Sequence, residues 1–283
     1  MWVWLSVCSA ILLGVYDVAK KQALKRNGVL WVLLVATALS ALFMSPKLSA
    51  GPLTDHLKLV AKACLVTTSW VSGLIGMKLL PLTTVSTIKA SRPVFVVTFS
   101  IILFGERLNL WQWAGVVIVF AALWMLSRSS RKEGIDFTND KGVAWMAVSV
   151  LSGAASALYD KHILQTLQPL FVQSWTNLYI TVLLGLCVLV KSVRDGEARE
   201  KFVWDWTLVL VAVLITISDA IYFFAVKDPG AQLSVISMVR RSSVVITFCL
   251  GALIFKEHNI KDKAMVLGVL LGGIALLLFG SSI

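Results

Sequence analysis

Residues 231–255 read AQLSVISMVRRSSVVITFCLGALIF, an apolar run long enough to cross a membrane, with two adjacent arginines at its centre. At about 1.5 Å of rise per helical residue, Arg241 is expected roughly 15 Å from Ala231, near the middle of a hydrocarbon core about 30 Å thick. One arginine at that depth costs about 2.5–3.5 kcal/mol. We therefore expect Arg240 and Arg241 to face a wet cavity or a binding partner rather than lipid.

The rest of the chain is apolar as well. Of its 283 residues, 58% are hydrophobic and 14% are charged, with a mean hydropathy of +0.85, whereas about 25% of the residues of soluble domains are charged. The apolar runs predict an all-α membrane protein with about ten transmembrane helices. The expected segments are residues 2–19, 29–44, 63–77, 82–104, 111–126, 142–164, 170–190, 205–226, 231–255 and 264–280. Most connections are short, so any function must lie within the helical bundle.

The net charge of +11 does not indicate a nucleic-acid partner. In a chain that crosses the membrane many times, Lys and Arg gather in the cytoplasmic loops, so most of the excess reflects topology. The four cysteines and three histidines are scattered without the spacing of a metal site. We expect no metal and no cofactor, and the lack of a G-x-x-x-x-G-K-[ST] motif argues against direct drive by ATP.

The two halves of the chain repeat each other. A tetrapeptide that ends in Tyr16 and Asp17, near the end of the first segment, returns as one that ends in Tyr159 and Asp160. At a single offset of 149, Arg92, Thr98 and Phe99 match Arg241, Thr247 and Phe248. Five segments per half is an odd number, so the second copy must enter the membrane in the opposite sense. We expect two inverted five-helix repeats, 1–127 and 142–283, joined by a basic loop at 128–141.

Inverted repeats of this kind are typical of transporters. Their substrate site lies near the membrane midplane between the repeats, and rocking of one repeat against the other gives alternating access. Arg92 lies ten residues into its segment, again about 15 Å deep. The repeat therefore predicts that Arg92 and Arg241 lie at the same depth, on two sides of one site.

The fourth segment carries more of this predicted site. Lys89 and Arg92 are three residues apart and share a helix face, which Ser86 extends by one turn. Pro93 has no amide hydrogen and its ring presses on the preceding turn, so a kink is expected there. One central acid, Asp219, cannot neutralise four central bases, and guanidinium groups bind carboxylate and phosphate through paired hydrogen bonds. The pattern favours an anionic ligand.

Asp219 and two Tyr–Asp pairs each allow two interpretations. Asp219 could orient Arg241 through a salt bridge or titrate as a proton-coupling carboxylate. The Tyr16–Asp17 and Tyr159–Asp160 pairs could gate the two mouths of a cavity, or anchor the helices at the interface with Asp17 paired to Lys20 or Lys21. Residues that could line the cavity by position alone are Trp70, Tyr222 and Gln232.

The chain resembles the drug/metabolite transporter superfamily, and within it the EamA-type family. The residues that carry the resemblance are Pro81 ahead of the fourth segment, Arg92-Pro93 inside it and Gly105-Glu106 after it, together with the ten-segment layout. The resemblance implies a multi-pass protein of the cell (inner) membrane that moves a small metabolite and is not an enzyme. Most Lys and Arg of the connections, Lys20 and Lys263 included, lie in the odd-numbered ones, which places both termini outside the cytoplasm. Relatives usually have both termini in the cytoplasm, so the orientation stays open.

The resulting hypothesis is a secondary active transporter, a monomer or homodimer in the lipid bilayer. It would move a carboxylate- or phosphate-bearing metabolite by alternating access through the basic midplane site. The alternative is export of neutral or zwitterionic metabolites such as amino acids, with the cations binding only a carboxylate. An intramembrane lipid-modifying enzyme is a less favoured hypothesis because it needs clustered catalytic acids or histidines, which the sequence does not offer. A passive channel is also less favoured than a transporter.

Overall fold

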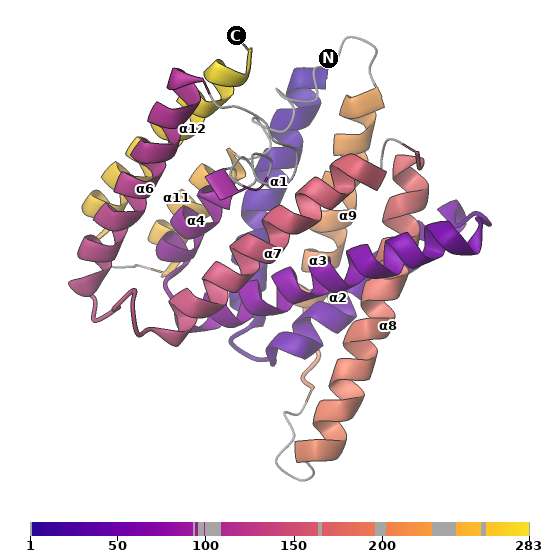
Figure 1. The fold of residues 1–283 in the computed structure, drawn as a ribbon. Coiled ribbons are helices and arrows are strands. Elements are labelled where there is room, and N and C mark those ends of the chain that lie inside the picture. Colours follow the sequence, from indigo (N-terminus) through magenta and orange to yellow (C-terminus); the bar gives the residue numbers. More distant parts are fainter. Residues whose placement is uncertain are drawn as a thin grey trace.

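The computed structural model is a bundle of α-helices (Figure 1). It describes residues 2–92, 94–95, 99, 109–163, 166–195, 202–227, 242–255 and 259–282, and none of these forms a β-strand. The first half contains α1 (Trp2–Ala23), α2 (Val29–Met44), α3 (Leu53–Leu79), α4 (Leu82–Ala90) and α6 (Leu110–Arg131). The second half contains α7 (Lys141–Ile163), α8 (Pro169–Asp195), α9 (Trp206–Lys227), α11 (Ser243–Phe255) and α12 (Ile260–Ser282). Figure 1 shows the two termini at the same end of the bundle.

Several of these helices have the length and composition of membrane spans. Among the described residues, four helical stretches meet both requirements: Leu53–Leu79, Leu110–Arg131, Lys141–Asp160 and Pro169–Val193. Three shorter stretches are also apolar: Val29–Met44, Trp206–Ile221 and Ser243–Phe255. The expected all-α membrane fold is therefore confirmed.

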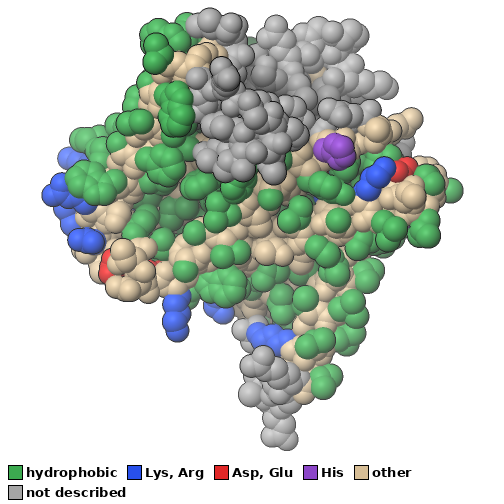
Figure 2. All heavy atoms as spheres, viewed as in Figure 1, with side chains coloured by type: hydrophobic (Ala, Val, Ile, Leu, Met, Phe, Trp, Pro, Cys, Tyr) green, Lys and Arg blue, Asp and Glu red, His purple; other side chains and the backbone are tan. Residues whose placement is uncertain are grey.

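The surface of α6 illustrates how the bundle meets lipid. Trp113, Val117 and Trp124 are exposed along one side of this helix, at the i, i+4, i+11 spacing of a single face. Val119 and Ala122 are completely buried on the other side. Figure 2 shows hydrophobic side chains spread over the described surface in this view, with Lys and Arg mainly toward its margins. Such an apolar surface would favour aggregation in water, but it is stable in contact with the hydrocarbon core of a membrane.

The helix pairs follow a pseudo-twofold pattern. Helix α1 packs along α9, and its counterpart in the second half, α7, packs along α3 in the same way. The pairs α2–α8 and α6–α12 each join a helix to its own counterpart, and α4–α11 joins helices of the fourth and ninth segments. This arrangement is what two inverted five-helix repeats produce when they interlock.

Serine pairs join the helices of two equivalent contacts. Between α1 and α9, Ser9 Oγ donates to the Ser218 carbonyl at 2.9 Å and Ser218 Oγ donates to the Ser9 carbonyl at 3.0 Å. Between α3 and α7, Ser69 and Ser149 make the same reciprocal bonds at 2.8 and 2.7 Å. Small hydroxyl residues let helix backbones approach closely inside a membrane, so these pairs hold the two repeats together along matching seams.

Two tryptophans hold loops at the ends of the bundle. Trp175 on α8 donates its indole hydrogen to the Ser49 carbonyl at 2.8 Å, in the loop before α3. Trp31 on α2 packs against Phe202, in the loop before α9, with ring centroids 5.2 Å apart. Trp31 and Trp175 differ by 144 residues, close to the offsets of the sequence repeat. The repeats therefore match at their ends as well as along their seams.

Helix α4 is enclosed by the bundle, and every residue from Leu82 to Ala90 except Lys89 is buried. The regular α-helix ends at Ala90. Beyond it, Ser91 N–H donates to the Ile88 carbonyl at 3.1 Å, and Val94 N–H donates to the Ser91 carbonyl at 3.0 Å. These tighter i to i−3 bonds interrupt the helix beside Arg92, in the region where the sequence predicts a kink.

Candidate functional site

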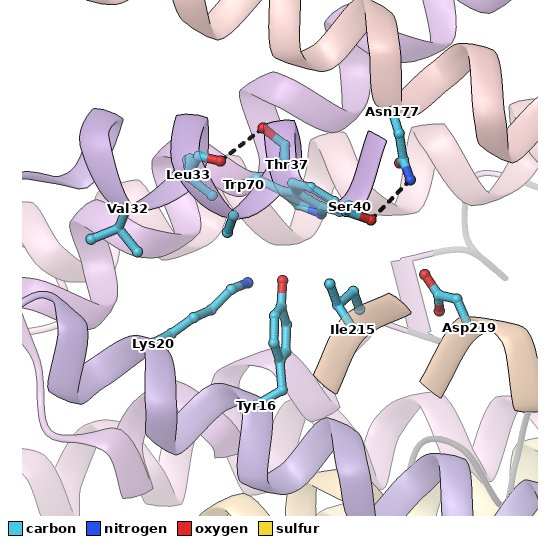
Figure 3. Close-up of a pocket in the computed structure, with 11 residues that line it drawn as sticks. Tyr16, Lys20, Val32, Leu33, Thr37, Ser40, Trp70, Asn177, Ile215 and Asp219 are labelled. Carbon is cyan, nitrogen blue, oxygen red and sulfur yellow. Dashed lines mark hydrogen bonds between the residues drawn. The ribbon is translucent and has the colours of Figure 1, made fainter. Parts of the chain in front are cut away.

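A small cavity, lined by apolar and polar side chains, lies between helices of both halves. Its volume is about 20 Å³, room for about one water molecule and not for a metabolite, so a substrate can enter only if the helices separate. Figure 3 shows the side chains of α1 facing those of α2 across this space. The residues that line it are Tyr16, Lys20, Val32, Leu33, Ala36, Thr37, Ser40, Trp70, Asn177, Ile215 and Asp219.

Lys20 places a buried ammonium group at this cavity (Figure 3). The residue is only 5% exposed. Its Nζ atom lies 3.9 Å from the ring centroid of Tyr16 and 5.6 Å from that of Trp70, and no described residue accepts a hydrogen bond from it. Aromatic rings compensate a buried cation only in part. The amine of Lys20 is therefore buried mainly against ring faces, beside the cavity that it lines.

Asp17 is shared by three cations. Lys89 Nζ on α4 lies 3.0 Å from Asp17 Oδ1 on α1. The charges of Lys20 and Arg92 are also attracted by Asp17, and Lys20 and Lys89 repel each other. Among the described residues, Asp17 thus has more cations around it than one carboxylate can pair with.

Arg92 occupies the seam between α3 and α7. Its Nη2 atom lies 3.4 Å from Ser69 Oγ, and its buried Nε atom has no hydrogen-bond acceptor among the described residues. A Cβ atom built onto Gly153 would lie 2.4 Å from Arg92 Cζ. The guanidinium group fits at this place only because residue 153 has no side chain.

The cavity has a negative end as well. Figure 3 shows Lys20, Tyr16, Ile215 and Asp219 in a row along one side of the cavity, with Lys20 and Asp219 at its two ends. Gln173 Nε2 lies 3.5 Å from Asp219 Oδ2. Nearby, Asn177 Nδ2 donates to Ser40 Oγ at 3.3 Å. The site can therefore present a cation, an acid and neutral amide and hydroxyl groups to one bound molecule.

The structure brings together several of the residues singled out in the sequence. Tyr16, Trp70 and Asp219 line the cavity, while Asp17, Lys89 and Arg92 form the charged group beside it. Ser86 is buried within α4, where its hydroxyl donates to the Thr83 carbonyl at 2.8 Å. The sequence offered Lys20 or Lys21 as a partner for Asp17, but the ion pair joins Asp17 to Lys89. Lys21 instead donates to the carbonyls of Met77 and Leu80 at the end of α3.

Other predicted residues lie elsewhere. Tyr159 donates to the Lys58 carbonyl at 3.2 Å and Asp160 pairs with Lys62 at 2.5 Å, so both belong to the α3–α7 contact rather than to the cavity. The backbone of Tyr222 lies in α9, and its side chain is not described. Four of the predicted site residues lie outside the described part of the chain: Pro93, Gln232, Arg240 and Arg241.

Sequence reasoning did not select Lys20, Thr37, Ser40 or Asn177. Lys20 was counted with the loop cations because the apolar run ends at Ala19, whereas α1 continues to Ala23. One signal could have identified it: Tyr16 and Lys20 are four residues apart and therefore share a helix face. Asn177 is an amide inside an apolar run, and it marks a polar interior in the same way.

Comparison with known proteins places this bundle in a family. The EamA-like transporter family matches residues 1–128 and 140–279, one match in each half of the chain. One crystal structure of a protein superposes with a TM-score of 0.66, covering 97% of this chain and 95% of its own, at 15% sequence identity; a likeness at this identity establishes the fold alone. No curated protein matches the sequence. The chain belongs to the EamA-like transporter family and is a multi-pass membrane transporter of the drug/metabolite transporter superfamily, with a small-molecule substrate.

Proposed function

We propose that this protein is a secondary active transporter of the cell membrane that moves a small carboxylate- or phosphate-bearing metabolite. The observation that carries the proposal is the group of cations around Asp17, above all the buried Lys20, which has no hydrogen-bond acceptor among the described residues. Charges interact strongly where water is scarce, and an unpaired buried charge is costly. An anionic ligand would supply the missing partner.

The proposed mechanism is alternating access between the two repeats, taken as 1–127 and 142–283 with a connecting loop at 128–141. Residues of both halves line the cavity, and its small volume is that of a closed state. Opening on one side at a time requires the seams α1–α9 and α3–α7 to shift in turn. Arg240 and Arg241 join the proposed site on the strength of the sequence repeat, which pairs Arg241 with Arg92.

A zwitterionic substrate is the second candidate, and Asp219 favours it. This carboxylate lies in the same cavity as Lys20. A molecule with an ammonium group near Asp219 and a carboxylate near Lys20 would meet a group of opposite charge at each end. In that case the cations select the carboxylate and the remaining polar groups contact the rest of the substrate.

Asp219 keeps two proposed roles. It can orient a cation of the site, or it can take up a proton that drives transport. Uptake into liposomes with an imposed pH gradient separates these roles, because only the second makes the rate depend on the gradient. A rate that does not respond to the gradient rules out proton coupling through Asp219.

The proposal is tested by thermal unfolding of the purified protein in inorganic phosphate, succinate, glucose 6-phosphate, alanine and glucose. A ligand present at about 100 times its dissociation constant stabilises the folded state by about 2.7 kcal/mol. We expect at least one of the three anions to raise the midpoint of unfolding, and glucose to leave it unchanged. Stabilisation by alanine alone would select the zwitterionic candidate, whereas equal effects of glucose and glucose 6-phosphate would contradict both. Saturable uptake of the stabilising compound into liposomes then separates a carrier from a passive pore.

The space beside Gly153, which the Arg92 guanidinium group occupies, allows a more specific prediction. In Gly153→Ala the new methyl group takes the space of the Arg92 guanidinium, so the arginine must move while the helix itself gains from alanine's better propensity. We expect the protein to fold and its affinity for inorganic phosphate to fall about tenfold, equivalent to about 1.4 kcal/mol.

The matched control is Gly185→Ala. The nearest atom to a Cβ at Gly185 is Leu34 Cδ1 at 4.0 Å, which is ordinary contact. Titrating phosphate against the unfolding midpoint of both variants checks the pair. If the two variants bind phosphate with the same affinity, the position of the Arg92 guanidinium beside Gly153 does not contribute to binding.

A further inference from the structure

Asp17 connects three helices through the two oxygens of one carboxylate. Oδ1 lies 3.0 Å from Lys89 Nζ on α4, and Oδ2 lies 3.5 Å from Thr247 Oγ1 on α11. Helix α4 belongs to the fourth segment and α11 to the ninth, one from each repeat, and the two helices pack against each other. The carboxylate of α1 therefore lies where both repeats meet beside the cavity.

The surroundings of Asp17 are those of a bound anion. Lys20, Lys89 and Arg92 all interact favourably with it. The side chains of the ion pair are not sealed, because Asp17 is 18% and Lys89 is 23% exposed. The pair can thus be reached and exchanged, unlike a pair locked inside a core.

The equivalent acid of the other repeat has a different partner. Asp160, 143 residues after Asp17, pairs with Lys62 at 2.5 Å in the α3–α7 contact. Neither acid lines the described cavity, but Asp17 follows the lining residue Tyr16 and pairs with Lys89 on α4. The two acids repeat in sequence but not in their contacts, so a role in the basic site belongs to Asp17.

We propose that Asp17 is an internal counter-anion of the empty site, and that the anionic group of the substrate competes with it for Lys20, Lys89 and Arg92. This inference rests on the proposed function. It has two consequences. The substrate binds more weakly than the cations alone would allow, because the competent state is only partly populated. The empty transporter carries less uncompensated charge through the low-dielectric interior, so it can change conformation without a substrate.

The test uses the full-length protein, two simple anions as probes and the isosteric variant Asp17→Asn. In sodium chloride, this variant should unfold at a lower temperature than the wild type, because three cations lose their shared carboxylate. Acetate, a bare carboxylate, should restore its unfolding midpoint in a saturable manner at constant ionic strength. Its affinity for inorganic phosphate should exceed that of the wild type about tenfold, because the competitor is gone.

Two variants control for a general loss of structure. Asp17→Glu keeps the charge and should behave as the wild type toward acetate. Asp160→Asn removes the equivalent acid and should show neither the acetate response nor the tighter phosphate binding. An Asp17→Asn protein that is recovered from membranes only in acetate also supports the proposal, whereas one that neither anion recovers contradicts it.

The outcomes also separate this inference from the proposed function. If no anion stabilises the wild type but Asp17→Asn responds to acetate, the counter-anion role stands and the anionic substrate is refuted. If anions stabilise the wild type but Asp17→Asn binds phosphate no more tightly and ignores acetate, the counter-anion role is overturned and the proposed function stands.

Discussion

Replacing Lys20 by methionine should make the protein more stable and unable to hold an anion. Methionine has a similar length and volume, and it removes a buried ammonium group that has no acceptor in the described part of the chain. We expect the free energy of unfolding to rise by about 1 kcal/mol, because the desolvation cost of the charge disappears. The affinity for inorganic phosphate should fall at least 30-fold, the effect of losing a charged hydrogen bond worth about 2 kcal/mol.

The neighbouring lysine provides the control with the opposite expectation. Lys21 donates to two carbonyl groups at the end of α3, so Lys21→Met should lower the free energy of unfolding by about 1.5–3 kcal/mol. Its phosphate affinity should remain that of the wild type. Thermal unfolding with and without phosphate measures both quantities. A Lys20→Met protein that is destabilised and binds phosphate normally would refute the role of Lys20 and identify it as a structural residue.

A gain of stability together with a loss of binding would be informative in itself. Functional sites hold groups that a purely structural design would avoid, and removing them commonly stabilises the fold. Lys20 fits this description because the described residues bury it against ring faces and give its ammonium group no hydrogen bond. A lysine that served the fold would have acceptors, as Lys21 does.

The limits of sequence reasoning in this chain are visible at the helix ends. The apolar run at 29–44 predicted α2 with the bounds that the structure has, since this helix lies wholly within apolar sequence. The run at 63–77 identified only part of α3, which begins at Leu53 and carries Asp55, Lys58 and Lys62 in its first turns. Hydropathy marks the hydrocarbon zone, whereas a helix continues through polar residues as long as its backbone stays paired.

The same distinction explains which site residues were found. Lys89, Arg92 and Asp219 lie within apolar runs, where a charge is an anomaly that the sequence itself reveals. Lys20 lies just beyond a run and resembles a loop residue until the packing of α1 against α2 and α3 encloses it. Whether a cation at a helix end faces water or a cavity depends on tertiary contacts, and a single sequence does not contain them.

Lys263 is a second cation at a helix end that tertiary contacts bury. Its replacement is expected to cause the largest loss in the free energy of unfolding. It was counted with the loop cations, yet its side chain is completely buried at the start of α12. Its Nζ atom lies 2.6 Å from Glu133 Oε2, in the connection between the two halves, and 3.2 Å from Thr83 Oγ1 on α4. One buried ammonium thus joins the connecting loop, the first repeat and the last helix.

Lys263→Met should therefore lower the free energy of unfolding by about 3–5 kcal/mol, the usual cost of leaving one partner of a buried ion pair uncompensated. Adding Glu133→Gln should recover most of this loss, because the stranded carboxylate is then neutral. The exposed pair Lys132–Asp262 joins the same two segments at 2.5 Å with side chains 67% and 39% exposed, and Lys132→Met should cost less than about 1 kcal/mol. Denaturant unfolding in detergent of the single and double variants forms a double-mutant cycle. Equal losses for Lys263→Met and Lys132→Met would mean that burial adds nothing to the pair, and would leave the connection between the repeats without its proposed anchor.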